Sequence, residues 1–167
     1  QALGFVVIAG GKHGDVSHNA LIGLEGGPYI ELFAFLKPNP GHRWAHALRY
    51  GGGFVDMCLC TSDLDADIAA FVAAGAKMEP LRAMSRTRPD GVELHWRLSL
   101  PQHESSGVVP FLIQDITPLA ARQPPAARHA NSVRAIRAVR YALSDSDAAA
   151  RFARILGQKG ERIRRDA

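Results

Sequence analysis

The segment that decides the fold is residues 54–75, FVDMCLCTSDLDADIAAFVAAG. Apolar side chains alternate with others over residues 54–60, which predicts a β-strand. Thr61-Ser62-Asp63 then supplies side chains that cap a helix, and Gly75 is a helix-ending residue. Between these signals the apolar residues recur at helical spacing, at Leu64, Ile68, Phe71 and Val72. The segment therefore predicts a strand followed by a helix of about a dozen residues.

The same pattern recurs elsewhere in the chain. Three strand-like stretches follow the helix, at residues 77–81, 92–100 and 108–116. The capping motif at 62–66, Ser-Asp-x-Asp-Ala, returns at 144–148, and both copies lead at the same spacing to a glycine, Gly75 or Gly157. Ala2-Leu3-Gly4 matches the end of the helix. A unit of strand, helix and three strands is thus predicted to repeat.

This repeat predicts the domain organisation. Residues 1–50 form an incomplete first module with strands at 5–9, 19–24 and 28–36, and Gly10-Gly11 with a polar loop between the first two. Residues 51–120 form a complete second module. Residues 121–135, rich in Pro, Ala and Arg, are expected to be a linker. Residues 136–167 begin a third module, with a strand at 136–143, a helix and a basic tail.

Composition narrows the class of protein. The apolar fraction of 47% and the charged fraction of 22% predict a soluble globular protein. No apolar run approaches membrane-spanning length and no export signal opens the chain, so we expect no membrane association and a cytoplasmic location. The net charge of +4 comes without interleaved aromatic residues, which argues against nucleic acid as a partner. The sequence contains no phosphate loop, GxSxG or HExxH motif.

Glu31 is the most informative polar residue. It interrupts the apolar run of residues 29–36, which predicts a strand buried on both faces. A buried carboxylate needs a partner, and either a divalent cation or an arginine would serve. Strand alternation places Glu31 with Tyr29 and Phe33 on one face. Glu31 is therefore either a ligand or base, or one half of an ion pair.

Other polar residues carry two interpretations each. Asp56 shares a strand face with the thiols of Cys58 and Cys60, and either lines a pocket or is a solvated strand end. Gln114 offers an amide oxygen to a hard cation, or a hydrogen bond to a neighbouring strand. On the strand at 92–98, His95 and Arg97 lie on the polar face. They serve as acid–base and carboxylate-binding groups if that face lines a cleft, and are solvated otherwise.

The sequence motifs of the chain resemble those of the glyoxalase-like branch of the vicinal-oxygen-chelate superfamily. The matching pieces are Leu3-Gly-Phe5 before Gly10-Gly11-x-His13, His18-Asn-Ala-Leu21, Tyr29-Ile-Glu-Leu32, residues 85–96 (SRTRPDGVELHW), Pro110-Phe-Leu-Ile113 and His129-Ala-Asn131. This resemblance implies an α+β fold of repeated β-α-β-β-β modules, in which curved mixed sheets enclose a cleft and helices lie outside.

The resemblance also implies a divalent metal ion (Zn, Ni, Mn or Fe) held by residues from the first and fourth strands of each module. Carried over, these ligands are Glu31, Asp56 and Gln114. The opening strand of the first module, which usually supplies a histidine, is absent from this chain. The corresponding position in the third unit is Ala138, which cannot bind a metal.

Two functions remain open from the sequence. The first is a metal-dependent lyase, isomerase or dioxygenase acting on a small oxygenated substrate, with Glu31 and His95 as catalytic residues and Phe33, Cys58 and Arg97 lining the pocket. The second is a metal-free module that sequesters a small molecule, whose candidate wall residues are Phe33, Phe35, Trp44 and Trp96. A scaffold without a ligand is a third possibility. Open sheet edges leave room for a homodimer, or their missing strands lie elsewhere.

Overall fold

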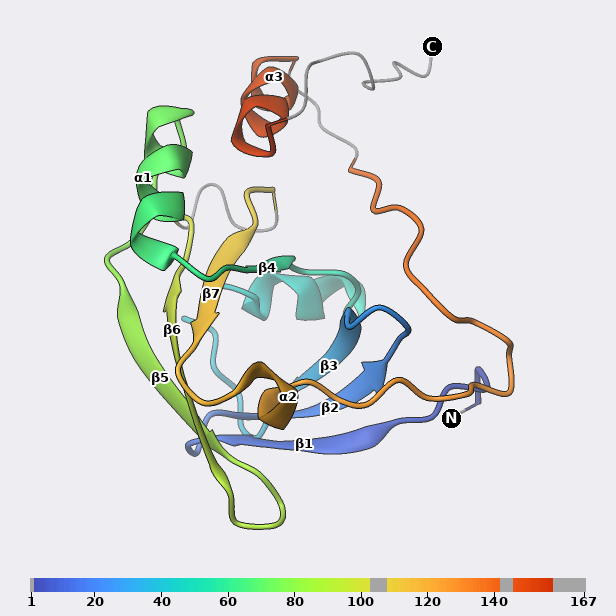
Figure 1. Cartoon of the computed structure of the whole chain (residues 1–167). Coiled ribbons are helices and arrows are strands. Elements are labelled where there is room, and N and C mark those ends of the chain that lie inside the picture. Colours follow the sequence, from blue (N-terminus) through green and yellow to red (C-terminus); the bar gives the residue numbers. More distant parts are fainter. Residues whose placement is uncertain (1, 103–107, 142–145, 158–167) are drawn as a thin grey trace. The chain divides into compact units, whose positions relative to one another are not determined.

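The structure is a computed structural model, and it describes residues 2–102, 108–141 and 146–157. The fold is mixed α+β, as the sequence predicts (Figure 1). Hydrogen bonding orders the strands as β3-β2-β1-β5-β6-β7-β4. Their bounds are β1 Ile8–His13, β2 Ser17–Gly23, β3 Tyr29–Phe35, β4 Cys58–Cys60, β5 Arg82–Thr87, β6 Glu93–Ser99 and β7 Phe111–Asp115. The helices are the 3₁₀ helix η1 Ala45–Tyr50, α1 Leu64–Ala73, α2 Leu119–Arg122 and α3 Ser146–Ile155.

Two compact units divide the chain, and each draws on three separate segments. Unit 1 comprises Gln1–His42, Ala83–Trp96 and Asp115–Val139. Unit 2 comprises Arg43–Arg82, Arg97–Gln114 and Arg140–Ala167. These contact-based units do not follow the predicted module boundaries at 50, 120 and 135, which stay a prediction. The chain order of elements from β4 to β7 is nevertheless strand, helix and three strands, the order that the repeat predicts.

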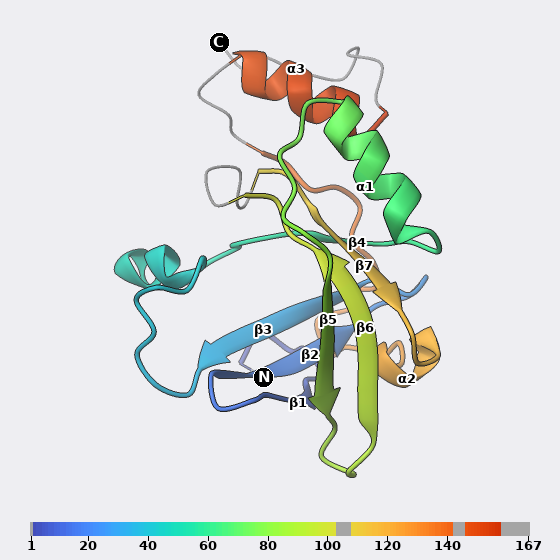
Figure 2. The same cartoon turned by 90° about the vertical axis from the view of Figure 1, so that its left-hand side faces the viewer.

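Helices α1 and α3 of unit 2 pack on one apolar cluster (Figure 2). Asp63 caps α1, because its side chain accepts a hydrogen bond of 3.1 Å from the Ala66 amide. Both helices are ten residues long and are followed by a glycine with positive φ, Gly75 at 94° and Gly157 at 63°. The buried cluster consists of Leu64, Phe71, Ala76, Val109, Leu112 and Ile155. No helix in the described part of the chain is long and apolar enough to cross a bilayer.

The first strand of unit 1 differs from the prediction. Instead of ending before Gly10-Gly11, β1 runs through both glycines to His13, with a register shift between Ala9 and Gly11. The glycines are needed because side chains from neighbouring strands cross them. A Cβ at Gly10 would lie 2.1 Å from Asn19 Oδ1, and one at Gly11 would lie 2.9 Å from an Arg86 guanidinium nitrogen. Gly10-Gly11 is therefore a strand segment with close approach, rather than a loop.

Three other predicted strands need correction. The strand at 54–60 shortens to β4, and Phe54 is 99% exposed. In place of the strand at 77–81 there is only an isolated bridge at Met78. The strand β5 begins later and forms a hairpin with β6 through the turn between Arg88 and Val92. Residues 136–141 form no strand, and the last two residues of that prediction lie outside the described residues, as do the cap at 144–145 and the basic tail.

The segment predicted to be a linker is packed into unit 1. Within residues 121–135, Arg122, Pro124 and His129 are buried. His129 Nδ1 accepts a hydrogen bond of 3.0 Å from the Val6 amide, and its Nε2 lies 3.0 Å from the Gly23 carbonyl oxygen. The proline- and alanine-rich composition does predict the irregular backbone of this segment, but not its attachment. Buried polar side chains bonded to backbone groups hold it in place.

Candidate functional site

Strands β2 and β3 of unit 1 place their odd-numbered residues on one face. The paired residues are Ser17 with Phe35, Asn19 with Phe33, and Leu21 with Glu31. On the neighbouring strand β1, His13 pairs with Ser17. Because side chains alternate along a strand, this register places His13, Glu31 and the two phenylalanines on the same face. The sequence-predicted grouping of Glu31 with Phe33 is thereby confirmed.

The rings on this face form the aromatic cluster, which we define as His13, Phe33, Phe35, His42 and Trp96. The Phe33 ring is stacked with the rings of His13 and His42, with centroids 6.2 and 5.6 Å apart. Phe35 meets Phe33 and His42 edge-on at 5.2 and 4.9 Å. Trp96 of β6 meets His13 edge-on at 6.5 Å. Four of these rings are half-buried, so part of their apolar surface is accessible.

Glu31 lies beside the cluster and is exposed, in contrast to the buried position that the sequence predicts. Its strand is not covered on both faces, since Leu32 is also 46% exposed. Glu31 Oε1 accepts a hydrogen bond of 2.6 Å from Asn19 Nδ2. Asn19 is buried, and its Oδ1 is the one buried side-chain polar atom without a hydrogen-bond partner among the described residues. The site therefore presents one exposed acceptor, the Glu31 carboxylate, whereas the unsatisfied Asn19 amide oxygen is buried.

Burial lowers the pKa of the His13 imidazole below its ordinary value of 6.5. The Glu31 carboxylate opposes this shift and the Arg86 guanidinium adds to it. His13 is consequently neutral at pH 7, and its Nδ1 lies 3.2 Å from the Ser17 hydroxyl. A neutral ring beside Phe33 presents an apolar face, which suits stacking of an uncharged aromatic group.

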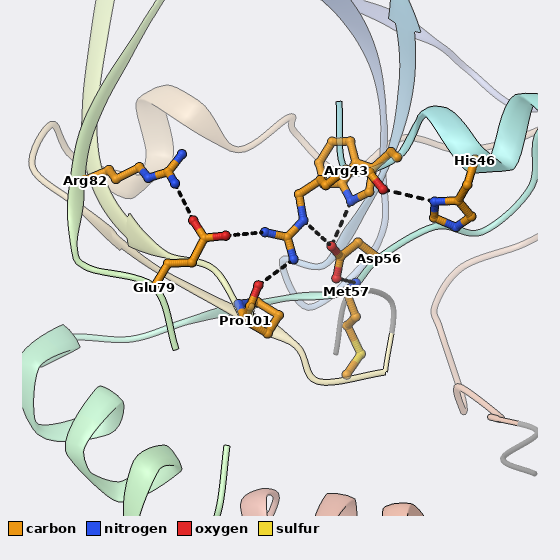
Figure 3. Close-up of polar contacts among 8 residues, drawn as sticks. Arg43, His46, Asp56, Met57, Glu79, Arg82 and Pro101 are labelled. Carbon is orange, nitrogen blue, oxygen red and sulfur yellow. Dashed lines mark hydrogen bonds and ion pairs between the residues drawn. The ribbon is translucent and has the colours of Figure 1, made fainter. Parts of the chain in front are cut away.

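A second polar cluster lies in unit 2 around Arg43 (Figure 3). Arg43 lies 4.0 Å from Asp56 Oδ2 and 3.6 Å from Glu79 Oε1, and donates a hydrogen bond of 2.7 Å to the Pro101 carbonyl. The Asp56 side chain is 3% exposed and also accepts hydrogen bonds from Trp44 Nε1 at 2.8 Å and from the Met57 amide at 2.9 Å. Burial raises the pKa of the Asp56 carboxyl, against the effect of these donors.

Known proteins match this sequence and fold. A family model described as a glyoxalase-like domain matches residues 1–156. The chain belongs to the glyoxalase-like domain family. A crystal structure of a hypothetical protein from Staphylococcus aureus matches with a TM-score of 0.56 at 20% identity. That match covers 71% of this chain and 53% of the other, so the chain spans about half the length of that neighbour. The comparison with curated proteins gives no match.

The two metal ligands predicted in unit 2 do not form one donor set. Gln114 Oε1 accepts a hydrogen bond of 2.5 Å from Arg97, and its Nε2 donates one of 2.6 Å to the Ser62 carbonyl beside α1. Asp56, in contrast, is bonded to Trp44 and lies beside Arg43. Each oxygen that would bind a dication already has a protein donor, and each has an arginine next to it.

Glu31, the third predicted ligand, belongs to unit 1 and is bonded to Asn19. Within residues 2–102, 108–141 and 146–157, no three His, Cys, Asp or Glu side chains are grouped to hold a metal ion. The residues present in this glyoxalase-like chain thus do not fit the divalent-metal centre that its superfamily implies. The metal site stays a prediction, and no chemistry is derived from it.

The remaining predicted site residues are not members of the aromatic cluster. The alternation on β6 is as predicted, with Leu94 and Trp96 buried. Because Trp96 faces His13, His95 points to the opposite face, where it lies 3.5 Å from Glu93. Arg97 of unit 2 lies 3.4 Å from Asp65. The two cysteines are not joined by a disulfide, and Cys58 is half-buried.

The sequence did not predict that His13, Asn19 and Arg86 share one face, or that His42 joins the aromatic cluster. The signal was available in part. Had Gly10-Gly11 been recognised as a strand segment, alternation would have paired His13 with Ser17 and set it near Phe35. Arg86 gave no such signal, because its strand β5 carries no buried apolar residue.

Proposed function

We propose that this glyoxalase-like chain binds a small molecule with a flat ring on the aromatic cluster of unit 1, without a metal ion. The observation that carries this proposal is the stacking of Phe33 with His13 and with His42, on a face that also carries an exposed carboxylate. Ligand sites in proteins are typically lined by aromatic side chains with a few polar groups. Of the two functions that the sequence leaves open, these contacts favour the binding module.

A ligand ring can stack on the aromatic cluster, and the exposed Glu31 carboxylate beside the cluster can orient the ligand. This carboxylate can accept a hydrogen bond, so a hydroxyl or amine on the ligand has a partner on this face. Phe33 and Phe35, predicted as wall residues, lie here, whereas Trp44 belongs to unit 2 and is bonded to Asp56.

Phe33→Ala is expected to weaken binding of a flat aromatic probe about three- to tenfold, because an aromatic pair contributes about 0.5–1.5 kcal/mol beyond area burial. The measurement is ligand-observed NMR titration of the full chain with benzyl alcohol. Leu32→Ala is the matched control, since Leu32 is the neighbouring apolar residue on the other face of β3. Equal loss in both variants would contradict the proposal, as would no change in either.

Elemental analysis of the purified protein is expected to find a divalent metal content far below one ion per chain, because Asp56 and Gln114 each carry an arginine contact. The same result is expected after incubation with nickel, zinc, manganese or iron and desalting. Benzyl alcohol binding should also survive chelation by EDTA. Stoichiometric metal that is lost in Glu31→Ala would overturn metal-free binding and support the metal-dependent enzyme instead.

A further inference from the structure

Arg86 is the one buried residue of β5, and it lies on the face that carries the aromatic cluster. It is 5% exposed, and its guanidinium donates a hydrogen bond to the Gly10 carbonyl. Gly11 leaves the space above its backbone for this side chain, since a Cβ there would meet Arg86 at 2.9 Å. Lys12 of β1 pairs with Thr87 of the antiparallel strand β5, so the next two residues, His13 and Arg86, lie opposite each other on one face of unit 1. The Arg86 charge accordingly lowers the pKa of His13.

In the described part of the chain this guanidinium has no carboxylate partner. No Asp or Glu oxygen there lies within 4.0 Å of an Arg86 nitrogen, whereas Arg43, Arg97 and Arg122 each have at least one. Glu31 acts on Arg86 through its charge only, beyond ion-pair distance. Removing a cation from water costs several kcal/mol unless an anion or sufficient hydrogen bonds compensate. Arg122, the other arginine found buried among the described residues, has Asp115 as its counter-ion, whereas Arg86 has none there.

The remaining guanidinium nitrogens are accessible rather than sealed. Asn19 Oδ1 is the single buried side-chain nitrogen or oxygen atom without a partner in the described structure, so no Arg86 nitrogen is both buried and unpaired. Guanidinium N–H groups form a planar fork that matches the two oxygens of a carboxylate. Arg86 is thus a buried residue whose remaining guanidinium nitrogens are not completely covered and have no carboxylate partner among the described residues.

We propose that Arg86 binds a single anionic group on the ligand whose ring stacks on the aromatic cluster. This inference rests on the proposed binding function and narrows its ligand to aromatic monoanions, with a carboxylate as the best fit to the guanidinium fork. Glu31 limits the number of negative charges that the face tolerates, because it carries its own beside the same cluster. A hydroxyl or amine on the ligand would meet the exposed Glu31 carboxylate.

The test compares benzoate, phenylphosphonate and benzyl alcohol, which share a ring and differ in charge, by NMR titration of the full chain. Benzoate is expected to bind about tenfold more tightly than benzyl alcohol, as a charge-assisted hydrogen bond allows. Arg86→Gln should remove this preference and Arg86→Lys should retain part of it. Arg88→Gln is the matched control, because it removes a charge from the same hairpin where Arg88 pairs with Asp90. Circular dichroism verifies folding of each variant.

Two results overturn the inference. If benzyl alcohol binds and benzoate binds no better, or if the benzoate preference survives in Arg86→Gln, Arg86 is not the anion partner, while the proposed function stands. If none of the probes binds, the proposed function fails and the inference fails with it. Phenylphosphonate separates the sources of the anion: weaker binding than benzoate indicates a carboxylate site, and equal binding indicates an anion site in general.

Discussion

Arg122→Met is expected to lower the free energy of unfolding by about 3–5 kcal/mol, because it leaves the buried Asp115 carboxylate without its partner. The two side chains are 5% and 10% exposed, and Arg122 Nη2 donates to Asp115 Oδ2 at 2.9 Å. Arg122 also donates to the Tyr29 hydroxyl and lies over the Tyr29 ring, 5.9 Å from its centroid. The loss amounts to a large part of the stability of a typical domain.

Urea unfolding followed by circular dichroism measures this change, and the midpoint of thermal unfolding should fall by about 10 °C. Arg134→Met is the matched control. Arg134 forms an ion pair with Glu25 at 2.9 Å in the same unit, but the two side chains are 76% and 52% exposed, so the change should stay below about 1 kcal/mol. The double variant Arg122→Met/Asp115→Leu should regain much of the loss. A single variant as stable as the parent would contradict a structural role for this pair.

The second large effect is expected in unit 2, where Leu64→Ala should cost about 2–5 kcal/mol. Leu64 is fully buried in the cluster on which α1 and α3 pack. Its truncation leaves a cavity in this apolar cluster, and the lost contacts add to the lost transfer free energy.

Val72→Ala on the same helix is the control for Leu64→Ala, since Val72 is 52% exposed and should change stability by about 0.5 kcal/mol or less. Urea unfolding of both variants gives the comparison. If Leu64→Ala is as mild as Val72→Ala, the packing of α1 on the apolar cluster is not a substantial source of stability. If both are severe, the helix itself is the sensitive element.

Local signals account for the parts of the fold that could be predicted. Helices α1 and α3 were predictable because capping, apolar spacing and a terminal glycine all act within a dozen residues. Strand β5 was not, since it has no apolar alternation and is positioned by the hairpin with β6. The attachment of residues 121–135 was equally hidden, because Arg122 and His129 are held by partners far away in sequence.

In the candidate site, too, the features set by local sequence were predictable and those set by tertiary packing were not. Glu31 and Phe33 were predicted to share a face because strand alternation is a local rule. The buried setting expected for Glu31 depended on what covers β3, which no local pattern specifies. Asp56 and Gln114 were grouped by a family resemblance, and their arginine contacts depend on tertiary packing. A binding role for Arg86 could not be predicted, because the lack of a carboxylate partner among the described residues depends on tertiary packing.

The turn between β2 and β3 sets the register of the two strands, and this register decides which side chains lie on the proposed binding face. The register pairs Asn19 with Phe33 and Ser17 with Phe35, while Leu32 and Ala34 lie on the other side. A slip of one residue in a strand exchanges its two faces. A single insertion in the connection at residues 24–28 would therefore replace an aromatic face by an aliphatic one, although every ring and Glu31 would still be encoded. Gain or loss of ligand recognition in such a protein can thus arise from a length change in a loop that touches no ligand.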